Sequence, residues 1–240
     1  MITKLSLAAL VALAASLPAP LSAAGESAYT DLVEALAAKD RLMSGFADSA
    51  IAVMVGEARR DPEMVEMEEE CAGTLDLMGQ TARPHLVASH ERGVTQYRAQ
   101  LLELFSSRLS PEEARGAAEF YASDDGRFLI SLAEQNESVE NVLSDVRGNE
   151  DGSVSAAALA ADKAVMEEKI RKGGDRTRLA KIGWFLMTAD WFRNFQTLKS
   201  EMHQLELALV NDDFTAEEGA AFDAALEEAF TAHFEACYAD

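Results

Sequence analysis

Three helix-start signals constrain what this chain can fold into. They lie at Asp61-Pro62, at Ser110-Pro111-Glu112-Glu113 and at Thr215-Ala216-Glu217-Glu218. In the last two, a hydroxyl residue is followed three places later by glutamate, which is the spacing of a capping box that satisfies the first backbone N–H groups of a helix. Proline after the capping residue is typical of the first helical turn, where its missing N–H has no partner. We therefore expect helices to begin at residues 62, 111 and 216.

Apolar residues recur at intervals of three and four between these signals, as in amphipathic helices. The first such helix is expected over residues 29–55, with a break near Lys39-Asp40, and the helix that starts at Pro62 is expected to end at Gly79. Further helices are expected over residues 86–109, 111–121, 127–132, 139–146, 156–170 and 175–210.

These helices predict the fold class. The 240 residues include 5 prolines and 14 glycines, too few to favour a strand-and-turn architecture. We expect an all-α fold, a helical bundle of two packed helical sections. The first section is predicted over residues 25–147 and the second over 156–240, with a linker over 148–155.

The first 24 residues have the pattern of a secretory signal peptide. Lys4 carries their only charge, thirteen uncharged residues follow from Leu5, and Ser22-Ala23-Ala24 places small residues before a cleavage site. Thirteen apolar residues are too few to span a bilayer, and no later segment approaches that length. We expect cleavage near Ala24, a periplasmic or secreted location and no integral membrane span. An uncleaved membrane anchor is the alternative.

Cys71 and Cys237 are the two cysteines of the chain. In an oxidising compartment an even pair favours a disulfide, which here would tie the last helix to an early one. In the competing interpretation, His233 and Cys237 lie four residues apart on one helix and form half of a metal or Cys-His catalytic site. No second pair of ligands with suitable spacing is visible in the sequence.

The middle of the chain carries motifs of a known family. They are Tyr97-Arg98, Leu109-Ser110-Pro111-Glu112-Glu113, Glu119-Phe120-Tyr121-Ala122-Ser123 and Gly126-Arg127. Over residues 84–134 they resemble the bacterial domain-of-unknown-function family 2059. The resemblance implies an exported helical domain in which a long helix precedes a capped short helix ending in Phe-Tyr. Asp124 stands where the family usually has proline, and the family brings no known chemistry.

The same residues predict a structural motif. Phe120 and Tyr121 can dock two rings on the neighbouring long helix, and Gly126 permits the backbone to reverse. The predicted structural motif consists of Ser110, Pro111, Glu113, Phe120, Tyr121, Ser123 and Gly126. A ligand site lined by Tyr121 and Ser123 is the alternative.

Basic and aromatic residues adjoin in the second section. Five basic residues and one acid lie between Arg171 and Lys181, and five aromatic residues follow within residues 184–195. Their spacing places them on one helical stripe, which can be core. Alternatively, the stripe is exposed beside a basic collar and contacts a partner protein or, peripherally, an anionic membrane. The candidate interaction patch consists of Arg176, Arg178, Lys181, Trp184, Trp191 and Phe195.

The charge balance and the motif search limit the function. Acidic residues number 42 and basic ones 21, a net charge of −21, which argues against nucleic acid as a partner because phosphate binding needs a basic face. HExxH, GxSxG, Walker and GxGxxG motifs are absent, so beyond the His233 and Cys237 alternative we assign no catalytic, metal or cofactor-binding residue. We expect a non-catalytic helical envelope protein without a cofactor, which binds another envelope protein or has a structural role. A carrier of a small apolar ligand or lipid is the alternative.

Overall fold

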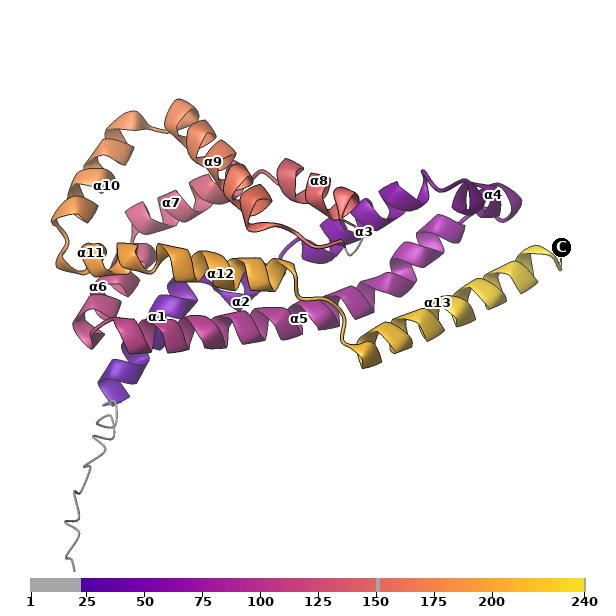
Figure 1. The fold of residues 1–240 in the computed structure, drawn as a ribbon, viewed down its shortest axis with the longest axis horizontal. Helices are drawn as coiled ribbons and strands as arrows, with labels where there is room; N and C mark the ends of the chain where they lie inside the picture. Colours follow the sequence, from indigo (N-terminus) through magenta and orange to yellow (C-terminus); the bar gives the residue numbers. More distant parts are fainter. Residues whose placement is uncertain (1–22, 150–151, 240) are drawn as a thin grey trace, which may run out of the picture.

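The protein is helical throughout the part described by its structure, a computed structural model that describes residues 23–149 and 152–239 (Figure 1). In chain order the helices are α1 (Ala23–Leu36), α2 (Lys39–Met43), α3 (Phe46–Ala58), α4 (Pro62–Glu70), α5 (Thr74–Arg108), α6 (Pro111–Ala122), α7 (Asp124–Gln135), α8 (Glu140–Gly148), α9 (Ala156–Gly173), α10 (Arg176–Thr188), α11 (Asp190–Thr197), α12 (Lys199–Val210) and α13 (Ala216–Cys237). These residues contain no strand, which confirms the expected all-α class. Among the described helices none has both the length and the apolar character needed to cross a membrane. Residues 1–22, which make up most of the expected signal peptide, lie outside the described residues.

The long helix α5 is the axis of the structure. Its 35 residues span about 52 Å at a rise of 1.5 Å per residue. Helices α1, α2, α3, α12 and α13 all pack against it. In Figure 1, α12 runs beside its C-terminal half and α13 beside its N-terminal half. The buried apolar residues of α5 include Leu75, Met78, Ala82, Val94, Tyr97, Leu101 and Phe105.

The expected helix end at Gly79 is wrong. Helix α4 ends at Glu70, and α5 runs without interruption through Gly79 and Pro84. The break lies instead at Gly73, whose φ of 95° is a conformation that favours glycine. Gly79 serves close packing, because a Cβ atom there would lie 3.0 Å from Cγ2 of Ile51 in α3.

The three helix-start signals are confirmed. The Asp61 carboxylate accepts a hydrogen bond from the backbone N–H of Glu63, the second residue of α4, at 2.9 Å. Ser110 and Thr215 each accept from the backbone N–H of the glutamate three residues later at 3.2 Å. Each of these glutamates accepts in return from the backbone N–H of its capping residue at 2.8 Å. The break expected near Lys39 is also present, since α2 begins there.

One hydrophobic core joins the two helical sections. Phe105 of α5 is fully buried, and its ring centroid lies 6.0 Å from that of Phe195 in α11. The ring centroids of Trp191 in α11 and Phe120 in α6 lie 5.8 Å apart. Leu32 of α1 is buried in the same cluster. Elements from before and after the linker therefore depend on each other for burial.

The end of the structure that is formed by α3, α4 and α13 is thinner and has fewer buried side chains. Helix α13 has 22 residues and none of them is buried, and the same holds for α3 and α4. Figure 1 shows α4 and the end of α13 at the extremity opposite α10 and α11. Because no side chain of α13 is fully buried, attachments at its two ends add to its packing against α5.

A disulfide attaches the C-terminal end of α13, as expected from the two cysteines. Cys71 and Cys237 pair with their Cα atoms 5.9 Å apart across 166 residues of sequence. Beside the bridge, the Tyr238 hydroxyl donates a hydrogen bond to the Glu70 carboxylate at 2.8 Å. The bridge leaves Cys237 without a free thiolate for the alternative site with His233, and the described residues contain no group of three side chains that could hold a metal.

An arginine cluster attaches the N-terminal end of α13. Arg92 of α5 donates to both carboxylate oxygens of Asp212 at 2.9 Å and to the Asp213 carbonyl at 2.7 Å. It also donates to both oxygens of Glu218 at 3.0 and 3.1 Å. The bond from Arg92, followed by the bond from the Thr215 backbone N–H, lowers the pKa of Glu218 to about 2.

Removal of the disulfide should lower the stability of the whole fold. A loop of this length contributes about 5 kcal/mol in the chain-entropy model. We expect Cys237→Ser, or reduction by a dithiol, to lower the free energy of unfolding by roughly that amount, measured by urea denaturation. The double variant Cys71→Ser/Cys237→Ser should no longer respond to reductant. If reductant leaves the unfolding curve of the wild-type protein unchanged, the disulfide is contradicted.

The arginine cluster should make stability depend on acid pH. The pKa of Glu218 is lowered in the folded state from its ordinary value of 4.5, so its contribution is complete above pH 4.5 and is lost as the pH falls towards 2. We expect Glu218→Gln to lower stability at neutral pH and to lessen its decline across that window, measured by urea unfolding at a series of pH values. The neighbouring exposed Glu217→Gln is the control, and an identical pH profile for both variants would contradict the assignment.

Candidate functional site: the outer face of α10

Helix α10 begins at a capping acid and rests on the core by one side. The Asp175 carboxylate accepts from the backbone N–H groups of Thr177 and Arg178, both at 3.0 Å. Arg178 in turn donates to the Asp125 carboxylate at 2.8 Å, and its guanidinium lies 4.2 Å from the ring centroid of Phe128. On the same inner side Ile182 is buried in the core, so the orientation of the helix is fixed.

The opposite side carries large apolar groups into solvent. Trp184 is 68% exposed, Met187 72% and Phe185 49%. Ala180, Trp184 and Met187 follow each other at intervals of four and three and so share one helix face. Phe185 still touches the core, since its ring stacks 5.5 Å from Phe120. Adjacent exposed aromatic and thioether groups of this size are typical of surfaces that contact a partner.

Unpaired cations flank this apolar face. Arg176 and Lys181 are exposed, and neither forms an ion pair with any described residue. Their neighbours are engaged, because Lys172 pairs with Glu168 at 2.6 Å and Arg178 with Asp125. Residues 169–193 contain seven basic and two acidic residues in a chain of net charge −21. We call the exposed side chains of Arg176, Lys181, Trp184, Phe185 and Met187 the α10 surface.

The candidate interaction patch is divided between surface and core. Trp191 and Phe195 are only 7% and 8% exposed and belong to the core, so they are not part of the α10 surface. The chain breaks at Ala189, where α10 ends and α11 begins. The seven-residue spacing from Trp184 to Trp191 therefore does not place the two indoles on one face. Phe185 and Met187 were not included in the candidate interaction patch. Their exposure depends on which side of α10 packs against the core, and spacing along the chain does not show this.

The predicted structural motif is assembled at the junction of α6 and α7. The ring centroids of Phe120 and Tyr121 lie 5.1 Å apart, and the Phe120 ring also lies near Trp191. The Ser123 hydroxyl donates to the Phe120 carbonyl at 2.6 Å and accepts from the Gly126 N–H at 3.2 Å, so it ends one helix and begins the next. Ser123 is thus occupied, and burial raises the pKa of Tyr121 to about 12. Tyr121 borders a groove of about 400 Å³, and Ser123 is not among the residues that line it.

Gly126 has a role other than the expected chain reversal. It lies inside α7 and is not among the glycines with positive φ. A Cβ atom at this position would lie 2.1 Å from the Phe120 carbonyl oxygen and 2.5 Å from the Tyr121 Cα. The expectation that it reverses the backbone is therefore wrong, and its missing side chain instead allows α7 to start directly against α6.

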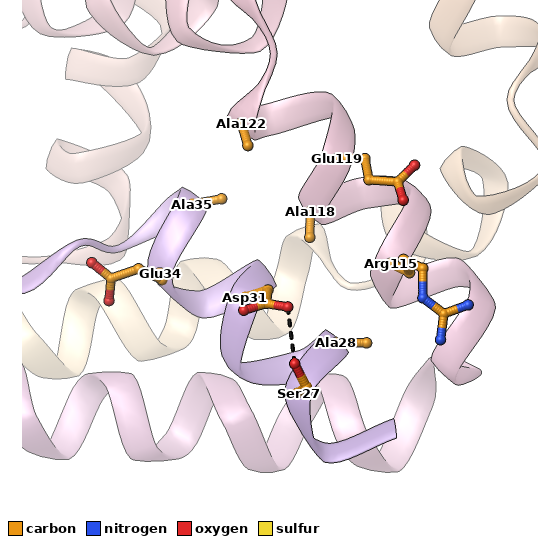
Figure 2. A pocket seen from close by; sticks show the side chains of 9 residues that line it. All are labelled: Ser27, Ala28, Asp31, Glu34, Ala35, Arg115, Ala118, Glu119 and Ala122. Atoms are coloured by element: carbon orange, nitrogen blue, oxygen red, sulfur yellow. Dashed lines mark hydrogen bonds between the residues drawn. The ribbon is translucent and has the colours of Figure 1, made fainter. Parts of the chain in front are cut away.

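A shallow groove lies between α1 and α6 (Figure 2). It has a volume of about 540 Å³, with alanines between the helices and charged side chains along its edges. Asp31 accepts from the Ser27 hydroxyl at 3.2 Å, and Glu34 pairs with Arg98 at 2.7 Å. A second groove, of about 400 Å³, runs beside Tyr121. Neither groove is lined by the Met and Phe residues that a carrier of an apolar ligand would need.

Comparisons with known proteins add no relative. No family model matches the chain, and neither the curated proteins nor the solved structures give a match. The resemblance of residues 84–134 to family 2059 therefore stays a prediction.

Substitution of Gly126 should test the helix junction. We expect Gly126→Ala to lower the free energy of unfolding by about 3 kcal/mol, because the new methyl group overlaps backbone atoms that cannot move aside. Gly56→Ala inside α3 is the matched control: nothing lies within 4 Å of its added Cβ, and it should stabilise by about 0.5–1 kcal/mol. Thermal melts followed by circular dichroism measure both, and a neutral Gly126→Ala would contradict the close approach.

Proposed function

We propose that this chain is an exported, non-catalytic helical protein of the cell envelope that docks on another envelope component through the α10 surface. Export rests on the signal-like pattern of residues 1–24. The docking role rests on one observation: Trp184 and Met187 stand in solvent beside the unpaired cations Arg176 and Lys181.

Physical chemistry supports a docking role for this face. Exposed Trp and Met side chains lose unfavourable contact with water when a partner covers them. Arg and Trp are also the residues most enriched at the energetic centres of interfaces. In an acidic chain, cations that form no ion pair can pair with negative charge on a partner. The inner side of α10 is therefore packed on the core through Ile182 and paired through Arg178, whereas its outer side carries exposed apolar groups and cations without an ion pair.

The carrier alternative has less support. An apolar ligand needs a concave site that covers most of its surface with apolar side chains. The two grooves on α1, α6 and α7 are open and have charged residues along them. We therefore propose docking rather than ligand transport.

Site-specific photo-crosslinking in the producing cells tests the proposal. Ala180 is exposed on the face of Trp184 and Met187, whereas Ala221 is an exposed alanine on α13. With benzoylphenylalanine at Ala180, we expect adducts with an envelope protein or lipid, identified by mass spectrometry. The same probe at Ala221 should give none of these adducts.

A second variant tests whether the adducts formed at Ala180 depend on the side chains of Trp184 and Met187. Trp184→Ala/Met187→Ala should abolish the adducts formed at Ala180 without a change in thermal melting, because both side chains are largely exposed. No adduct at Ala180, or the same adducts at Ala180 and Ala221, would overturn the docking proposal.

A further inference from the structure

The α10 surface has the chemistry of a membrane-contacting face, and we infer that its partner is an anionic phospholipid surface. The inference rests on the proposed docking function and names its partner. It is argued from the exposed apolar groups of α10, from the position of its cations and from the distribution of acids along the molecule.

The apolar groups have the character of interfacial side chains. Trp184, Phe185 and Met187 lie close to the corner where α10 gives way to α11. An indole with an N–H donor at one edge suits the boundary between headgroups and acyl chains. The two grooves described above lie on α1, α6 and α7, whereas these side chains project outward from a helix. Projecting side chains fit a deformable lipid phase, while a protein partner would need a matching hollow.

The cations are placed to meet anionic headgroups. Arg176 and Lys181 flank the apolar face, and Arg171 lies in the last turn of α9. All three are exposed and form no ion pair with a described residue. Asp175 lies among them, but its carboxylate is engaged by the first N–H groups of α10. Each cation near an anionic bilayer strengthens binding roughly fivefold.

The net charge of −21 does not prevent this contact, because the densest acidic elements lie at the far end. Helix α4 has five glutamates in nine residues, and α13 has six acids and no Lys or Arg. Figure 1 shows both helices extending to the extremity opposite α10, with α5 between the two ends. That helix is about 52 Å long, whereas electrostatic screening at physiological ionic strength acts over about 8 Å. An end-on approach therefore brings the basic end to the membrane while the distant acids are screened.

Vesicle binding tests the inference with the full protein. We expect co-sedimentation with vesicles of equal parts phosphatidylglycerol and phosphatidylcholine, weak binding to pure phosphatidylcholine, and a loss of binding as salt is raised. The two tryptophans give an internal reference, because Trp184 is exposed and Trp191 is buried. Binding should shift Trp emission to the blue, and Trp184→Phe should remove that shift.

Charge reversal provides the matched comparison. Lys181→Glu should weaken partitioning onto the anionic vesicles at least fivefold, whereas Arg59→Glu should change it less than twofold. Arg59 is likewise exposed and forms no ion pair with a described residue, but it follows α3, away from α10. Circular dichroism melts should be unchanged for both variants.

Three outcomes would overturn the inference: no binding to anionic vesicles, equal binding to both vesicle types, or equal effects of Lys181→Glu and Arg59→Glu. If vesicles do not bind but the probe at Ala180 crosslinks to a protein, the docking function stands and its partner is a protein. If neither vesicles nor crosslinks are found, both proposals fail.

Discussion

The aromatic packing around Phe105 is the interaction on which the rest of the structure depends. Trp191 and Phe195 project from α11 into the space beside α5 and α6. A helix of eight residues such as α11 does not persist in water by its own propensity, so this burial holds it in place. Because α10 and α12 are connected directly to α11, the same contact determines where they run. The outer face of α10 stays in solvent as a result.

Burial and charge are distributed unequally along the molecule. The core lies at the end formed by α1, α6, α10 and α11, whereas α3, α4 and α13 bury no residue completely. At that thinner end, covalent and ionic contacts supplement the hydrophobic packing, with the disulfide at one end of α13 and Arg92 at the other. The acidic residues of α4 and α13 lie in this part, so the basic segment around α10 is separated from them.

Local features of the fold could be read from the sequence because their causes lie within a few residues. A capping box requires only a hydroxyl residue and a glutamate three positions later, and both boxes form as expected. The disulfide was also predictable, since the chain has no other cysteine for either partner. The candidate site was predictable in part: Arg176, Lys181 and Trp184 are exposed on α10, whereas Arg178 is engaged with Asp125.

By itself, the sequence determined the all-α class, the starts of the capped helices and the pairing of Cys71 with Cys237. Tertiary structure alone decided which of two similar tryptophans is buried, because helical spacing cannot be carried across the break at Ala189. It also decided the roles of Gly79 and Gly126, whose missing side chains admit Ile51 and the Phe120 carbonyl. Periodicity describes one helix at a time, whereas burial and close approach depend on which other helix lies opposite.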